Sequence, residues 1–360
     1  MIQKLLLSDF RNFKEKLIEF PKDTTVIVGA NASGKTNILE AINYLSTGKS
    51  FKAGVEQEVI KQDTEIARVK GKISTRNEFQ VLEVVMTPGQ ISLGEEKTSR
   101  SPRKRLLIGG QGKRMRDFVG KFPSVLFSPL DMDLVISSPS KRRRFLDNVL
   151  AQADSEYLRS LRAYEKGLRH RNKLLSLIFE RKAKRSELTY WDMLLIKNGS
   201  LITRKRADFI GYINVFDQEE FRQEFKLQYD KSVISEGRLQ KYANAELAAG
   251  VTLVGPHRDD FIIFENRRDL SKYGSRGEQR LAVLWLKLSE LDYIKSALDI
   301  SPTLLLDDIF SELDEGHREV VAEVAKKQQT IITTADPDFL SNLKGVFEVK
   351  LSPDQKRQKN

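Results

Sequence analysis

The sequence predicts an α/β protein whose head is assembled from both ends of the chain and is interrupted by an α-helical insert. Apolar, β-branched runs alternate with helical spacing at the start of the chain. From Ser138 to about Tyr242 the pattern changes to long, charged, helical segments, and the alternation resumes beyond Gly250. We therefore expect residues 1–135 and 246–360 to form the head and residues 136–245 to form a helical insert.

Composition limits the class of protein. Of 360 residues, 40% are hydrophobic and 31% are charged, and no apolar run reaches the roughly 18 residues of a membrane span. The absence of cysteine suits a reducing cytoplasm, and we expect a soluble, cytoplasmic chain with no membrane partner. A net charge of +11 favours a polyanionic partner, nucleic acid before membrane, although simple solubility would also account for it.

The first part of the head is expected to alternate strands with one helix. Thr24 to Val28 is a compact β-branched strand, and apolar residues at helical spacing predict a helix from Asn37 to Leu45. A polar, basic segment from Thr87 to about Lys121 is predicted as a loop. The remaining strands are expected within Ile2–Phe20, Ile66–Ile73, Val81–Met86 and Ser124–Phe127.

The second part of the head continues this alternation. A strongly apolar helix is expected from Gly277 to Ser296. Strands are expected at Val251–Val254, Phe261–Glu265, Thr303–Leu306 and Thr330–Thr334.

A phosphate-binding motif lies between the strand at Thr24–Val28 and the helix that follows. Residues 29–36 match G-x-x-x-x-G-K-[ST], in which backbone N–H groups cradle phosphates at a helix N-terminus. Lys35 would bind the β- and γ-phosphates of ATP, and the Thr36 hydroxyl would ligate Mg²⁺. The alternative is a Gly/Ser-rich turn before a helix. The nucleotide-binding residues are expected to be Gly29, Ala30, Asn31, Ala32, Ser33, Gly34, Lys35, Thr36 and Asn37.

Two carboxylates end the apolar strand at Thr303–Leu306. Asp307 would hold Mg²⁺, and Asp308 would orient or polarise the attacking water, which makes Asp308 and Lys35 the expected catalytic residues. Taken alone, two acids after a strand are more often a helix cap and a turn. Together with the phosphate-binding motif, they favour a nucleotide hydrolase.

A third motif, Ser275-Arg276-Gly277-Glu278-Gln279-Arg280, opens the apolar helix. An ordinary helix cap at Ser275 would need the same residues. The order of the three motifs along the chain is that of the ABC and SMC class of ATPases, in which this signature helix completes a partner's nucleotide site. We therefore predict an SMC/ABC-type P-loop ATPase head that forms an ATP-dependent homodimer, with Ser275, Gly277 and Gln279 contacting ATP in trans.

Further segments resemble one family closely, that of bacterial RecF proteins of DNA replication and repair. They are Leu7-Ser8-Asp9-Phe10-Arg11-Asn12-Phe13, Val125-Leu126-Phe127-Ser128-Pro129, Arg142-Arg143-Arg144-Phe145-Leu146-Asp147, His170-Arg171-Asn172-Lys173-Leu174-Leu175, Gly255-Pro256-His257-Arg258-Asp259-Asp260 and Leu306-Asp307-Asp308-Ile309-Phe310-Ser311-Glu312-Leu313-Asp314.

The resemblance implies an ATP-dependent dimer on duplex DNA near single-strand gaps, with weak DNA-stimulated ATPase activity, which acts with RecO and RecR to load recombinase. Two positions depart from the wider pattern. Leu130 stands where the family is commonly acidic, and Thr334 stands where many relatives in the wider class carry a switch histidine. Thr334 is a candidate for holding the γ-phosphate or water.

Basic residues outside these motifs are candidates for DNA contact. The main set has no apolar face to bury and little acid nearby, with a solvated loop as the alternative: Arg103, Lys104, Arg105, Lys113, Arg114 and Arg116. For the run Lys141–Arg144 we expect pairing within the chain, with Asp131, Asp133 or Asp147, slightly ahead of DNA contact. The tripeptide from His257 to Asp259 is expected to be structural or to bridge the lobes.

Three functions remain in competition at this point: an ATP-gated DNA repair protein, the nucleotide subunit of a transporter, and a P-loop kinase for a small molecule. The transporter would need a glutamine after the strand near Phe127 and a later switch histidine, and neither is present. The kinase would leave the signature at Ser275 without a role.

Overall fold

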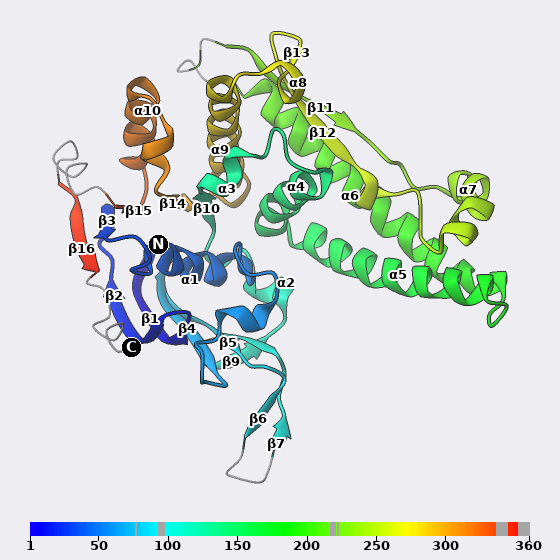
Figure 1. Ribbon diagram of the computed structural model, residues 1–360, viewed down its shortest axis with the longest axis horizontal. Helices are drawn as coiled ribbons and strands as arrows, with labels where there is room; N and C mark the ends of the chain where they lie inside the picture. The colour runs from blue at the N-terminus through cyan, green and yellow to red at the C-terminus, as the bar shows by residue number, and fades with distance from the viewer. Residues whose placement is uncertain (76–77, 93–97, 217–220, 222, 336–344, 352–360) are drawn as a thin grey trace, which may run out of the picture. The chain divides into compact units, whose positions relative to one another are not determined.

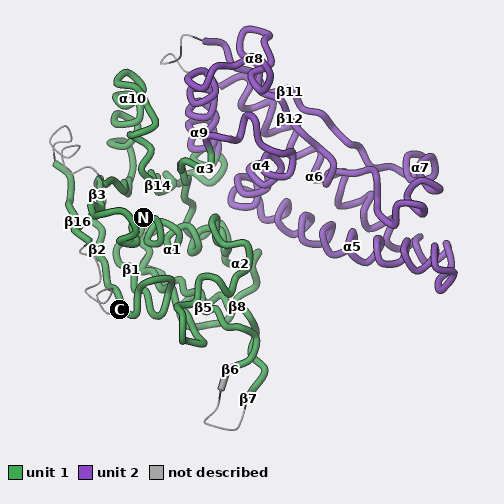
Figure 2. Tube along the Cα trace, in the orientation of Figure 1, with its two compact units in different colours: residues 1–131, 294–360 green, residues 132–293 purple. Residues whose placement is uncertain are grey.

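The computed structural model describes residues 1–75, 78–92, 98–216, 221, 223–335 and 345–351. These residues form two compact units (Figure 2): the first comprises residues 1–131 and 294–360, and the second residues 132–293. A head from both chain ends and an inserted unit were predicted. The predicted insert of 136–245 is too short, however, because residues 246–293 belong to the second unit.

The first unit contains a five-stranded, fully parallel sheet in the order β10-β14-β15-β3-β16. Its strands are β3 (Thr24–Gly29), β10 (Ser124–Phe127), β14 (Thr303–Asp307), β15 (Thr330–Thr334) and β16 (Phe347–Leu351). All but β16 were predicted. In β14 and β15 every residue is buried, as expected of parallel strands covered on both faces.

The second sheet of this unit is antiparallel, in the order β2-β1-β4-β5-β8-β9. Helix α1 (Lys35–Thr47) contacts strands of both sheets, and its apolar residues share one core with the inner face of the antiparallel sheet (Figure 1). The strands are β1 (Ile2–Phe10), β2 (Phe13–Glu19), β4 (Ala67–Ser74), β5 (Phe79–Met86), β8 (Lys104–Ile108) and β9 (Gln111–Lys113).

The segment predicted as a loop from Thr87 to Lys121 is instead structured. It contains β8 and β9, the separate hairpin of β6 (Gln90–Ser92) and β7 (Thr98–Arg100), and α2 (Met115–Phe118). Its polar composition hid these strands, because one face of an antiparallel sheet can carry charged residues. The other short elements of the unit are η1 (Glu56–Val59), η4 (Ile309–Glu312) and α10 (Glu315–Ala325), and α3 (Pro129–Met132) crosses the first unit boundary.

The second unit is mainly helical, as predicted. Its helices are α4 (Pro139–Ala153), α5 (Ser155–Phe179), η2 (Arg185–Leu188), α6 (Thr189–Val215), α7 (Glu236–Ala249), η3 (Pro256–Arg258) and α8 (Leu270–Tyr273), and α9 (Arg276–Leu298) continues into the first unit. None of the helices formed by the described residues is long and apolar enough to cross a membrane.

A small antiparallel sheet and the packing of α9 explain why the second unit extends to residue 293: Trp285 packs against Phe225, and Tyr293 packs against Phe209. Strand β11 (Phe225–Asp230) pairs with β12 (Asp260–Glu265) along six residues, and β13 (Arg268–Asp269) pairs with β12. This pairing attaches the residues after 246 to the helical unit. The strand predicted at Val251–Val254 does not form.

Candidate nucleotide site

The phosphate-binding loop connects β3 to α1, as the sequence predicts. The backbone turns through left-handed conformations at Ala32 (φ 65°) and at Gly34 (φ 101°), the residue before the helix. Gly34 is required for space as well, because a Cβ there would lie 2.7 Å from Asn12 Nδ2 and from Phe13 Cζ. Gly29 is similarly confined by Ser33 Oγ and by the Leu351 carbonyl. The loop therefore brings backbone N–H groups to a helix N-terminus suited to anions.

Lys35 is almost fully buried within this loop. Its ammonium donates to the carbonyl oxygens of Gly29 at 2.6 Å and Ala30 at 3.1 Å. Burial lowers the pKa of Lys35, and the charges of Asp308 and Asp307 oppose that shift. Ser33 Oγ is also buried and has no hydrogen-bond partner among the described residues. A phosphate oxygen at the loop would fit both the cation and this unsatisfied hydroxyl.

Asp307 and Thr36 meet at the end of β14. Asp307 Oδ1 accepts a hydrogen bond from Thr36 Oγ1 at 2.9 Å and from Thr333 Oγ1 at 2.8 Å. A hydroxyl and a carboxylate in contact are the oxygen ligands that Mg²⁺ takes when it also binds substrate phosphates and water. The residues expected to bind the metal therefore fit it. Thr333, which holds the carboxylate in place, was not predicted.

Asp308 takes a strained position directly after the strand. Its backbone is left-handed (φ 51°), and its N–H donates to the carbonyl oxygen of Thr333 at 3.1 Å. Its side chain does not cap the short helix η4, so the alternative of a helix cap does not hold. Burial raises the pKa of the carboxyl; the charge of Lys35 opposes this shift and that of Asp307 adds to it. These effects suit a group that exchanges a proton with water.

A brace from the β1–β2 turn supports the loop, and the sequence did not predict it. Asn12 Nδ2 donates to the Ser33 carbonyl at 3.2 Å and Asn12 Oδ1 accepts from Asn37 Nδ2 at 2.8 Å. Arg11 forms a two-pronged ion pair with Glu40, at 2.8 and 2.6 Å. Glu40 lies on the side of the predicted helix opposite Ile38, Ile42 and Leu45, so the pattern does not predict its burial. In the structure Glu40 is fully buried, and a buried carboxylate requires a partner.

Thr334 lies at the end of β15, opposite Val28 in the neighbouring strand β3. Thr334 therefore lies at the same edge of the sheet as the phosphate-binding loop, which follows β3. Leu130, which stands where the family is commonly acidic, has an exposed side chain. The next residue, Asp131, caps the turn by accepting hydrogen bonds from Ser128 N and Oγ at 2.8 and 2.9 Å.

The signature motif starts α9 in the second unit. The Glu278 N–H donates to Ser275 Oγ at 3.3 Å, and the Ser275 N–H donates to Glu278 Oε2 at 2.7 Å, which is a reciprocal cap. Hydrogen bonds from the Ser275 backbone, from Arg268 and from the Ser275 hydroxyl lower the pKa of Glu278 to about 2. Gln279 donates to the carbonyls of Leu270 and Gly274, and a Cβ added at Gly277 would meet open space. The helix start is thus both capped and open to approach.

The six predicted DNA contacts do not share one environment. Lys104 points inward, where its ammonium donates to the Gly48 carbonyl at 2.9 Å and pairs with Glu56, so its side chain is only 16% exposed. This corrects its assignment to the basic surface: along β8 it lies on the same face as the buried Leu106. The other five, which are Arg103, Arg105, Lys113, Arg114 and Arg116, are exposed.

Within the run Lys141–Arg144, the two middle residues pair inside the chain. Arg142 forms a two-pronged ion pair with Asp260, both bonds at 2.7 Å, and Arg143 donates to the Asp259 carbonyl at 2.7 Å. Internal pairing is therefore confirmed for these two. The acids named for it were wrong, because the partners lie more than a hundred residues away.

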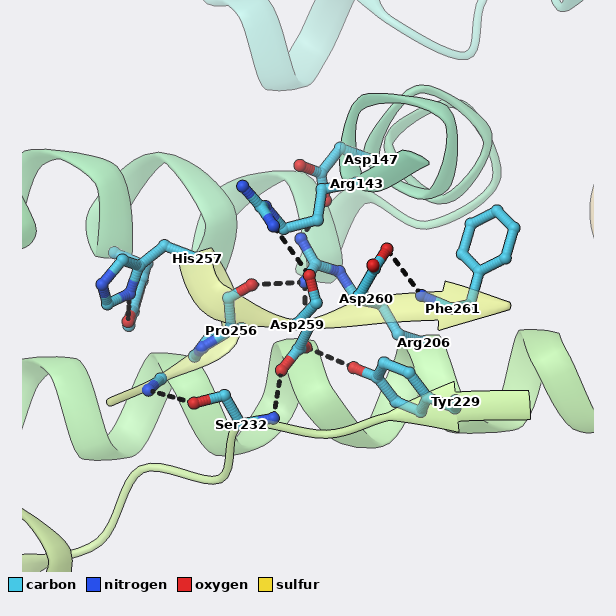
Figure 3. Close-up of polar contacts among 12 residues, drawn as sticks. Arg143, Asp147, Arg206, Tyr229, Ser232, Pro256, His257, Asp259, Asp260 and Phe261 are labelled. Atoms are coloured by element: carbon cyan, nitrogen blue, oxygen red, sulfur yellow. Dashed lines mark hydrogen bonds and ion pairs between the residues drawn. The ribbon is translucent and has the colours of Figure 1, made fainter. Parts of the chain in front are cut away.

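The His257–Asp259 segment belongs to a buried polar cluster of the second unit (Figure 3). Asp259 is fully buried, contacts Arg206 at 3.0 Å, and accepts from the Ser232 N–H at 2.6 Å and the Tyr229 hydroxyl. Arg206 also binds Asp147 at 2.7 Å. Each buried charge is thus paired, as burial requires. Of the two expected roles, these contacts support the structural one.

Comparison with known proteins identifies the family of this chain. A family model described as the RecF/RecN/SMC N terminal domain matches residues 1–358. The curated DNA replication and repair protein RecF of Lachnoclostridium phytofermentans is 35% identical over 352 residues, covering 95% of both chains. That of Halalkalibacterium halodurans is 34% identical over 361 residues, covering 95% of this chain and 94% of its own.

A solved structure of the recombination mediator protein RecF with ATP, in the RecFOR pathway, superposes with a TM-score of 0.83. It is 31% identical and covers 94% of this chain and 92% of its own. The predicted SMC-type P-loop ATPase fold with an inserted lobe is thereby confirmed. Because the family model and the curated relatives match along nearly the whole length, the chain belongs to the RecF family of DNA replication and repair proteins.

Proposed function

We propose that this chain binds ATP with Mg²⁺ and hydrolyses it slowly as a conformational switch, and that its ATP-bound form dimerises on duplex DNA near single-strand gaps. There it helps RecO and RecR to load recombinase. The proposal includes a cytoplasmic location.

The observation that carries the proposal is the grouping of Lys35, Thr36, Asp307 and Asp308 at the carboxyl ends of parallel strands. Asp307 and Thr36 are in contact, and Asp308 follows Asp307 directly. Lys35 would move from the loop carbonyls to the β- and γ-phosphates, since these offer it negative charge. Thr36 and Asp307 would hold Mg²⁺, and Asp308 would polarise the attacking water. The related RecF structure with ATP supports this assignment.

DNA binding rests on charge and on the family. The net charge is +11, and five exposed cations lie just before, on and after β8: Arg103, Arg105, Lys113, Arg114 and Arg116. No described residues interleave aromatic rings with these cations, which favours contact with the phosphate backbone over base stacking. Recombinase loading with RecO and RecR is supported by the resemblance to the RecF family.

Hydrolysis in the presence and absence of DNA tests the proposal. Phosphate release should be slow without DNA, should rise when gapped duplex is added, and should disappear in Lys35→Ala, which leaves the γ-phosphate without its fixed ammonium. Lys326→Ala, at an exposed lysine of the same unit, is the matched control and should behave as wild type. The proposal would be contradicted if DNA did not change the rate of ATP hydrolysis, or if the protein did not bind DNA in the presence of ATP. The transporter and kinase alternatives would then have to be considered again.

A further inference from the structure

Helix α5 carries a row of cations along its exposed face. The row, called here the α5 stripe, consists of Arg159, Arg162, Lys166, Arg169 and Lys173. The intervals of three, four, three and four residues place all five side chains on one side of the helix. At a rise of about 1.5 Å per residue, the stripe is about 21 Å long.

The opposite face of α5 is buried and satisfies its own charge. Tyr157, Leu161 and Tyr164 pack there, and the one arginine on that face, Arg171, pairs with Asp192 at 2.6 Å and with Glu246 at 2.8 Å. Apolar packing against α6 and α7 therefore holds the helix in place. The stripe contributes nothing to this packing.

The stripe itself has almost no acid to pair with. Arg162 lies 3.8 Å from Glu165, and no other ion pair to the stripe is found in the part of the chain that the structure describes. Like charges three and four residues apart on a helix repel each other. Five cations in this pattern are thus unfavourable for the helix alone, and a polyanion lying along them would relieve the repulsion.

We propose that the α5 stripe binds the phosphate backbone of duplex DNA, which is a second DNA contact in addition to the five exposed cations near β8. The inference rests on the DNA-binding part of the proposed function. Interfaces with DNA are polar and strongly basic, whereas the centre of a protein interface is apolar and depleted of charge. The exposed face between Arg159 and Lys173 fits the first description. A single strand would require aromatic platforms, and the neighbouring rings of His170 and Trp191 are stacked on each other at 4.6 Å.

The test removes four charges from the stripe, in the variant Arg159→Gln, Lys166→Gln, Arg169→Gln and Lys173→Gln. Arg162 is kept because it contacts Glu165. Glutamine is about as good a helix former as lysine and arginine, so the helix should persist. A matched control removes four exposed lysines from other elements of the same unit: Lys226, Lys231, Lys241 and Lys272, each changed to Gln. Both proteins lose the same net charge.

Binding of a fluorescent 30-base-pair duplex is measured with ATP between 50 and 200 mM salt. The stripe variant should bind more than about tenfold more weakly at low salt. The slope of log affinity against log salt should flatten by about 0.9 for each phosphate that is no longer neutralised, or about 3.6 for four. The control should keep the wild-type slope. Melting should occur at or above the wild-type temperature, because repulsion is removed; a structural role for the stripe would lower it.

The outcomes separate this inference from the proposed function. If wild type itself binds no duplex, the proposed function fails. If wild type binds with a steep salt slope that the stripe variant retains, the stripe is not a DNA contact although the proposed function stands. Unchanged duplex binding together with a loss of poly-glutamate binding would assign the stripe to an acidic protein and overturn the inference.

Discussion

Asp308 illustrates how much chemistry depends on single side chains in this site. Its left-handed backbone turns the residue out of β14, and Lys35 and Asp307 act on its charge in opposite directions. A carboxyl whose pKa is raised by burial is less stable as an anion than in water. Such a group is suited to accept a proton from water, whereas Asp307 is held by two hydroxyls.

Changing Asp308 to Asn should keep Mg-ATP bound and slow hydrolysis by roughly two to four orders of magnitude, as expected for loss of a general base. Because the folded pKa is raised, folding is opposed by the charge at neutral pH, so the variant should be no less stable than wild type. Single-turnover hydrolysis, ATP affinity and thermal melting check these expectations. Glu315→Gln on α10 is the control. If Asp308→Asn hydrolyses ATP as fast as this control, Asp308 has no role in the mechanism.

The buried side chain of His257 should make the stability of the protein depend on pH. Its Nε2 lies 3.0 Å from the Thr252 carbonyl, which must accept, so Nδ1, 2.8 Å from the Tyr164 hydroxyl, accepts from Tyr164. Because Nδ1 can accept from Tyr164 only when it carries no proton, this bond favours the neutral ring. Burial lowers the pKa of His257 to about 4; the hydrogen bond to Thr252 opposes the shift, and Arg258, Arg143 and Arg171 add to it.

A lowered histidine pKa means that the unfolded chain takes up a proton before the folded one. Stability from this group is therefore complete above the unfolded value of 6.5 and is lost as the pH falls to about 4. The loss should be about 3 kcal/mol. In urea unfolding, the difference between wild type and His257→Gln should shrink by about this amount from pH 7.5 to 4.5. A difference that is independent of pH would show that the ring is not held neutral.

At the scale of elements, the alternation of side chains along a strand decides the environment of each cation at the start of β8. Lys104 faces the core side of the sheet, and Arg103 and Arg105 face solvent. The cations are neighbours in sequence, but one of them fastens the strand to Gly48 and Glu56, while the others are available to a partner.

Neutralising the five exposed cations near β8 together should weaken DNA binding for all sequences alike; they are Arg103, Arg105, Lys113, Arg114 and Arg116. The slope of log affinity against log salt should flatten by about 0.9 for each phosphate left without its cation. Lys104→Gln should instead leave the slope unchanged and destabilise the protein by about 1 to 2 kcal/mol, since it leaves Glu56 and the Gly48 carbonyl without their donor. Fluorescence anisotropy and thermal melting separate the two effects. A flatter salt slope for Lys104→Gln would return this residue to the DNA surface.

At the scale of the whole molecule, the nucleotide site and the signature helix belong to different compact units. At the capped start of α9 the Ser275 hydroxyl accepts from the Glu278 N–H. A Cβ added at Gly277 would meet no atom of the described residues within 4 Å, so their contacts do not require a glycine there. A partner's nucleotide would supply such a requirement, since a helix N-terminus and small residues suit phosphate.

Mixing two inactive variants tests shared sites. Ser275→Arg should bind ATP through its own loop but fail to dimerise, and Lys35→Ala should fail to bind ATP tightly. In their heterodimer one composite site carries both lesions and the other carries none, so partial ATPase activity should return on mixing. If each site were formed within a single chain, every chain would keep its own defect and mixing could not restore ATPase activity. Absence of recovery, with heterodimers shown by crosslinking, or normal dimerisation of Ser275→Arg would contradict the trans arrangement.

The phosphate-binding loop motif, the two carboxylates at the end of β14 and most of the parallel sheet that carries them could be predicted from the sequence. The loop from Gly29 to Thr36, the carboxylates of β14 and the strands β10, β14 and β15 are encoded in short stretches whose periodicity and turn residues act locally. Such features depend on neighbours within a few residues. They can therefore be predicted without knowing the fold.

The contacts between residues far apart in the chain, and the boundary between the two units that follows from them, become apparent only in the folded structure. The pairing of β11 with β12 and the packing of Trp285 against Phe225 connect residues after 245 to the helical unit. Arg142 forms its ion pair with Asp260 and not with an acid nearby in the sequence. The inward orientation of Lys104 and the row of cations on α5, in which only Arg162 has an ion pair among the described residues, were equally hidden. Whether a cation is paired depends on which surfaces folding brings together, and one sequence does not specify those long-range contacts locally.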